Sequence, residues 1–95
     1  MHLVKLNKIG GGIMEYFVKV EDEEITELYG CQDGITVNFD GNSWSMSGMK
    51  YKTLVTSPEY QRIDKSKAMI ISKGADPEMM VNAFVMSMLN GGRLM

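Results

Sequence analysis

Two Asp-Gly dipeptides, Asp33-Gly34 and Asp40-Gly41, interrupt segments in which apolar and polar residues alternate. Asp-Gly is a strong β-hairpin signal, because both central residues of a type I′ turn need positive φ, which glycine adopts freely and aspartate tolerates. Two such turns in succession predict three antiparallel strands joined as a meander. The chain is therefore expected to build its core on an antiparallel sheet.

The apolar positions of the three strands agree with these turns. A two-residue loop at the first turn sets Leu28 opposite Phe39. The same loop at the second turn sets Val37 opposite Trp44. One face then collects the apolar side chains of Leu28, Ile35, Val37, Phe39, Trp44 and Met46. Because both turns independently give the same apolar face, we expect this face to line the core.

Further strands are expected on both sides of the meander. Residues 14–20 and 49–55 alternate as half-buried strands do, and residues 68–72 form a continuous apolar run typical of a central strand. Residues 57–60 predict a cap and one helical turn inside a polar loop. Residues 1–13 are expected to hold a short, loosely attached N-terminal strand.

The segment from Asp76 to Gly92 predicts a helix that is apolar around most of its circumference. Asp76 suits the N-cap and Pro77 the first helical position. Only Glu78 and Asn82 form a polar strip, so one sheet cannot cover all the apolar residues. The uncovered side needs a second partner, most simply another copy of the chain.

The flank of this helix that carries Met80, Val81, Phe84 and Met88 is bulkier, and we assign it to the core. The opposite flank carries Met79, Ala83 and Met86 and is assigned to the partner. The expected oligomer interface comprises Met79, Ala83, Phe84, Met86 and Met88.

Length and composition limit the class of protein. Ninety-five residues support a single domain over 1–95, and the predicted fold class is α+β, with an antiparallel sheet of about five or six strands and one C-terminal helix packed on one face. The single cysteine fits a cytoplasmic chain without disulfides. A net charge of −2 gives no reason to expect nucleic acid or an anionic membrane as partner.

The sequence offers no convincing catalytic or metal-binding set. Cys31 is expected on the non-core face of its strand, and the lone His2 cannot be placed beside it as a base. The acidic run Glu21–Glu24 lacks the spaced ligands and glycine of a calcium loop and is expected to be an exposed turn. We therefore expect that the chain is not an enzyme and that it binds neither a metal ion nor a cofactor.

The best ligand candidate is a basic group after the meander. Its cations could meet the phosphate of a small anionic, nucleotide-like ligand, and its tyrosines could stack on a base. Ordinary surface charge at a strand edge is the alternative interpretation. The candidate residues are Lys50, Tyr51, Lys52, Tyr60, Arg62, Lys65 and Lys67.

Two functional hypotheses follow. The first is a non-enzymatic, homo-oligomeric binding protein that occupies a surface of another protein; its small size and ten methionines are also compatible with a phage-type protein that interferes with a host. The second is a protein that sequesters a small anionic ligand near a subunit interface. No motif of a known family can be quoted from these residues.

Overall fold

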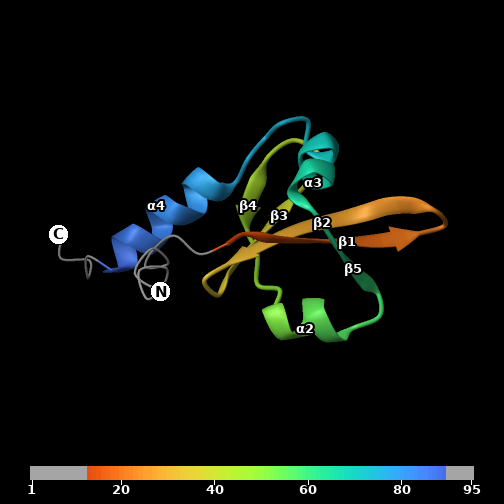
Figure 1. Cartoon of the computed structure of the whole chain (residues 1–95), viewed down its shortest axis with the longest axis horizontal. Coiled ribbons are helices and arrows are strands. Elements are labelled where there is room, and N and C mark those ends of the chain that lie inside the picture. Colours follow the sequence, from red (N-terminus) through yellow and green to blue (C-terminus); the bar gives the residue numbers. More distant parts are fainter. Residues whose placement is uncertain (1–12, 90–95) are drawn as a thin grey trace, which may run out of the picture.

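The structure is a computed structural model, which describes residues 13–89 (Figure 1). Over this range the chain forms a five-stranded antiparallel sheet with the strand order β4-β3-β2-β1-β5, together with three helices. The elements follow the chain as β1 (Glu15–Glu21), β2 (Glu24–Gln32), β3 (Ile35–Phe39), β4 (Trp44–Met46), α2 (Tyr51–Thr56), β5 (Tyr60–Ile63), α3 (Lys65–Ile71) and α4 (Glu78–Leu89). The predicted α+β class, with a C-terminal helix after an antiparallel sheet, is confirmed.

The helices divide between the two faces of the sheet. On the first face, the core side chains Tyr16, Val18 and Val37 pack with α3 and α4. On the second face, Phe17 stacks edge-on against Tyr51 of α2, with ring centroids 6.2 Å apart. Because side chains alternate along a strand, β1 is buried on both sides.

The first meander turn has the predicted geometry. Asp33 and Gly34 adopt φ of 53° and 81°, and Leu28 lies opposite Phe39. The hairpin between β1 and β2 turns at Asp22 and Glu23, which also have positive φ, so the expected exposed acidic turn is confirmed.

The predicted register of the second turn is wrong by two residues. The loop spans residues 40–43, so Phe39 lies opposite Trp44 and Val37 opposite Met46. The Asp40 carboxylate causes this, because it accepts hydrogen bonds from the backbone N–H groups of Asn42 and Ser43 at 2.8 and 2.9 Å. A shift of two residues keeps every side chain on its predicted face.

Two strand predictions after the meander are wrong. The expected strand over 49–55 is instead α2, whose single buried residue is Leu54. The expected cap and turn at 57–60 is present, because the Ser57 hydroxyl oxygen accepts from the Glu59 N–H at 3.2 Å and the Ser57 carbonyl from the Tyr60 N–H at 3.3 Å. The polar loop expected around it is instead β5, which pairs antiparallel with β1. The expected central strand over 68–72 is α3, which begins where the Asp64 carboxylate accepts a hydrogen bond from the Lys67 N–H at 2.9 Å. A short apolar run does not by itself distinguish a strand from a buried helical turn.

The start of α4 follows prediction, but its orientation does not. The Asp76 carboxylate accepts a hydrogen bond from the Glu78 N–H at 2.9 Å. Val81 and Val85 face the core, whereas Met80 and Phe84, which we assigned to it, are 37% and 43% exposed. A polar contact contributes to this orientation of α4. Asn82 accepts a hydrogen bond from Gln32 of β2, so the expected polar strip faces the sheet.

Some expectations fall outside the described residues. These are the N-terminal strand before residue 13, the side chain of Met88 and the chain beyond Leu89. Within residues 13–89, no helix is both long and apolar enough to span a bilayer.

Leu54→Ala is expected to lower the free energy of unfolding by about 2–4 kcal/mol, because Leu54 is 1% exposed and its loss leaves a cavity under α2. Val55→Ala, next to it but 41% exposed, is expected to change it by less than about 0.5 kcal/mol. Urea denaturation of both variants measures the difference. Equal losses would contradict a helix at this position.

Tyr16→Phe is expected to leave the free energy of unfolding at pH 7 within about 1 kcal/mol of the parent, because the buried Tyr16 hydroxyl has no hydrogen-bond partner within residues 13–89. Burial, assisted by Asp76 and Glu78, raises the pKa of Tyr16 to about 12. The unfolded tyrosine ionises first, so the parent loses stability as pH rises from about 10 to about 12. Thermal melts from pH 8 upward should show a smaller alkaline loss for the variant; an equal loss would contradict the burial.

Candidate functional site

The outward side of α4 carries several exposed apolar side chains. Met79 is 82% exposed, Phe84 43% and Met86 48%. We call this surface the exposed α4 stripe, and it comprises Met79, Met80, Ala83, Phe84 and Met86. Figure 1 shows the C-terminal half of α4 projecting past the end of the sheet, and the exposed fractions of the side chains show that the stripe faces away from the core.

One lysine pairs with both carboxylates at the N-terminal end of the stripe. The Lys65 ammonium lies 3.1 Å from a carboxylate oxygen of Asp76 and 3.1 Å from one of Glu78. Hydrogen bonds to these two carboxylates raise the pKa of Lys65. From Met79 to Leu89 the sequence has no charged residue. The stripe is therefore apolar and electrically neutral.

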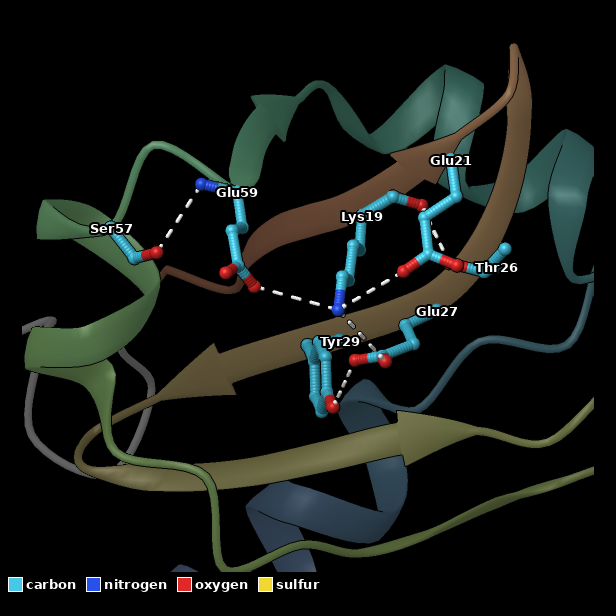
Figure 2. Close-up of polar contacts among 7 residues, drawn as sticks. All are labelled: Lys19, Glu21, Thr26, Glu27, Tyr29, Ser57 and Glu59. Carbon is cyan, nitrogen blue, oxygen red and sulfur yellow. Dashed lines mark hydrogen bonds and ion pairs between the residues drawn. The ribbon is translucent and has the colours of Figure 1, made fainter.

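The second face of the sheet carries a polar cluster (Figure 2). The Lys19 ammonium lies 3.2 Å from Glu21, 3.4 Å from Glu59 and 3.9 Å from Glu27. The Tyr29 hydroxyl donates to the Glu27 carboxylate at 2.6 Å. These contacts join β1, β2 and the start of β5 in one network.

This network changes the titration of its members. The pKa of Lys19 is raised, chiefly by its hydrogen bond to Glu21. The pKa of Tyr29 is raised by burial and then by its hydrogen bond to Glu27. The Tyr29 ring meets the Tyr60 ring edge to face, with centroids 5.8 Å apart. Tyr29 therefore stays protonated, and the two rings form an aromatic pair on the sheet.

The predicted basic group is distributed over several elements. Tyr51 and Lys52 belong to α2 and Lys50 precedes it; Tyr60 and Arg62 belong to β5, and Lys65 and Lys67 to α3. Since α2 and α3 cover opposite faces, the structure does not bring all seven residues into one site.

Two of its cations are also already paired. Arg62 forms an ion pair with Glu15 and lies 5.1 Å above the Phe17 ring, and Lys65 holds the start of α4. Tyr51 donates a hydrogen bond to the same Glu15. Anion binding by this group stays a prediction that no contact of the described residues supports.

Cys31 lies on the second face, as expected, but is more buried than expected, at 4% exposed. The Thr36 hydroxyl donates to its sulfur at 3.5 Å. Among residues 13–89, no three histidine, cysteine, aspartate or glutamate side chains are arranged to share a metal ion.

Comparisons with protein-family models, with curated proteins and with solved structures gave no match. Function must therefore be argued from the two surfaces themselves.

The cluster around Lys19 was not predicted from the sequence. The cluster can be recognised only when the position of β5 is known, because Glu59 reaches Lys19 only when Tyr60 pairs with Lys19. The available signal was the acid-rich stretch from Glu15 to Asp40, in which Lys19 is the only base. A lone cation among acids at alternating strand positions indicates an ion-pair network.

Lys19→Met is expected to lower the melting temperature at pH 7 and low salt, because Glu21, Glu27 and Glu59 then repel each other without a cation between them. Added NaCl should recover part of the loss by screening. A melting temperature independent of salt would contradict this account.

Proposed function

We propose that this chain is a non-enzymatic binding protein that pairs with a second copy of itself through the exposed α4 stripe and acts by occupying a surface of another protein. The observation that carries the proposal is the exposure of Met79, Phe84 and Met86 on one helix that has no charged residue after Glu78. Contiguous exposed apolar surface of this kind marks interaction sites in small proteins.

The order of residues along the stripe supports a second copy as occupant. Ala83 lies midway between Met80 and Met86. Two α4 helices packed antiparallel about Ala83 bring Met80 of one copy opposite Met86 of the other. The small alanine permits close approach of the helix axes, and flexible thioethers fill the remaining gaps.

Electrostatics do not oppose this pairing. The nearest carboxylate, Glu78, is held by Lys65 of the same chain, so like charges do not meet in the interface. Full burial of a methionine or phenylalanine is worth about 1.5–3 kcal/mol, and these side chains are already partly covered. We therefore expect a dimer of about micromolar affinity rather than an obligate one.

Met86→Glu is expected to shift the protein from dimer to monomer, because two carboxylates would be buried in each interface. Met86 is 48% exposed, so the fold should be retained, with an unchanged circular dichroism spectrum. Sedimentation equilibrium from about 1 to 200 µM covers the expected dissociation range.

The matched control is Val55→Glu, which places the same charge at a residue that is 41% exposed on α2, on the other face of the sheet. It should leave the dimer intact. A parent protein that remains monomeric throughout this range would overturn self-association through α4.

A further inference from the structure

The second face of the sheet is covered by a helix at one end only. Helix α2 shelters Phe17 and Leu54 near the start of β1. Tyr29 lies opposite Phe17 and Tyr60 lies opposite Lys19, and both tyrosines are only half-buried. In Figure 2 no helix lies over Lys19, Glu27 and Tyr29. This part of the second face is therefore an unpartnered surface with two aromatic side chains.

The chain's own Lys19 shows which chemistry this face accepts. Its ammonium is held by three carboxylates, and the cluster keeps a formal charge of −2 because three acids share one base. The side chains of Glu21, Glu27 and Glu59 remain 55%, 37% and 60% exposed. Each carboxylate can therefore accept further hydrogen bonds from a cation that arrives from outside.

The hairpin beyond this cluster adds more negative charge. Asp22, Glu23 and Glu24 are exposed, and none forms an ion pair with another residue of the described chain. The face and its hairpin thus combine six acids, Glu21, Asp22, Glu23, Glu24, Glu27 and Glu59, with one base, Lys19. Such a local excess attracts a cationic partner although the whole chain carries only −2.

The arrangement favours lysine or arginine side chains over a metal ion. The Lys19 ammonium already occupies the point on which the three carboxylates converge. The aromatic pair offers ring surface for the aliphatic stem of a long cationic side chain and a π face for its charge. A metal ion uses neither feature.

We propose that this face, which we call the tyrosine–glutamate face (Glu21, Glu27, Tyr29, Glu59 and Tyr60), docks a lysine- or arginine-bearing segment of a partner protein. This inference rests on the proposed function, because it specifies which kind of surface on the other protein the chain occupies. Since α4 packs on the opposite face, pairing through α4 leaves this face free on both copies. The dimer then presents two docking faces and gains avidity for a partner that carries two basic segments.

The test measures binding of a hexalysine peptide to the full chain by isothermal titration calorimetry at low salt, with amide chemical-shift mapping. Saturable binding is expected, with shifts concentrated on the strand segments that carry Lys19, Glu27 and Tyr60. Affinity should fall as salt rises. The double variant Glu27→Gln/Glu59→Gln, which keeps side-chain shape, should weaken binding roughly fivefold or more.

The matched control is Asp33→Asn/Glu78→Gln, which removes the same net charge at the first meander turn and at the start of α4. It should retain nearly the parent affinity. Equal weakening by both double variants, shifts centred elsewhere, or no saturable binding would each overturn the proposal, and so would tighter binding of magnesium than of the peptide.

Repeating the titration with Met86→Glu separates this proposal from the proposed function. If the Met86→Glu variant is monomeric and still binds hexalysine, the result supports docking at the tyrosine–glutamate face independently of the role of α4. A dimer that fails to bind the peptide overturns the docking face alone and leaves self-association standing.

Discussion

Burial of β1 on both faces is the constraint on which the rest of the structure depends. Tyr16 and Val18 anchor the first face and Phe17 the second, each at most 2% exposed. β1 also lies between β2 and β5 and pairs with both. Its alternating side chains therefore set where α3, α4 and α2 can pack. Loss of either layer would expose large apolar side chains, so both layers are needed to keep the side chains of this inner strand out of water.

The two candidate surfaces arise because the helices cover only part of this sheet and bury only part of their own apolar residues. Helix α4 meets the core through Val81 and Val85, which leaves its methionines outward. Helix α2 is only six residues long and covers one end of the second face. The chain thus has one neutral apolar surface and one acidic aromatic surface on opposite sides of the sheet. This separation is compatible with self-association and partner binding at the same time.

Charge partners are mostly distant in sequence. Lys65 pairs with the start of α4, Arg62 with the start of β1, and Lys19 with Glu59. The sequence separates an acidic stretch from a basic one, which invited the prediction of an anion site. Folding instead brings many of these opposite charges together. Arg62 and Lys65 therefore contribute to the attachment of β5 and α4 before they could serve any ligand.

The sequence by itself determined the features fixed by local chemistry. Asp33-Gly34 defines a turn because few other dipeptides accept its backbone angles, and Asp76-Pro77 defines the start of α4 because it satisfies the first helical N–H groups. Only the tertiary structure decided the features that depend on distant partners. Residues 51–56 and 65–71 form helices that bury Leu54 and Ala68 against the sheet. The exposed side of α4 was set by contacts between distant segments, in which Val81 and Val85 pack in the core and Asn82 accepts a hydrogen bond from Gln32, and no local pattern encodes these contacts.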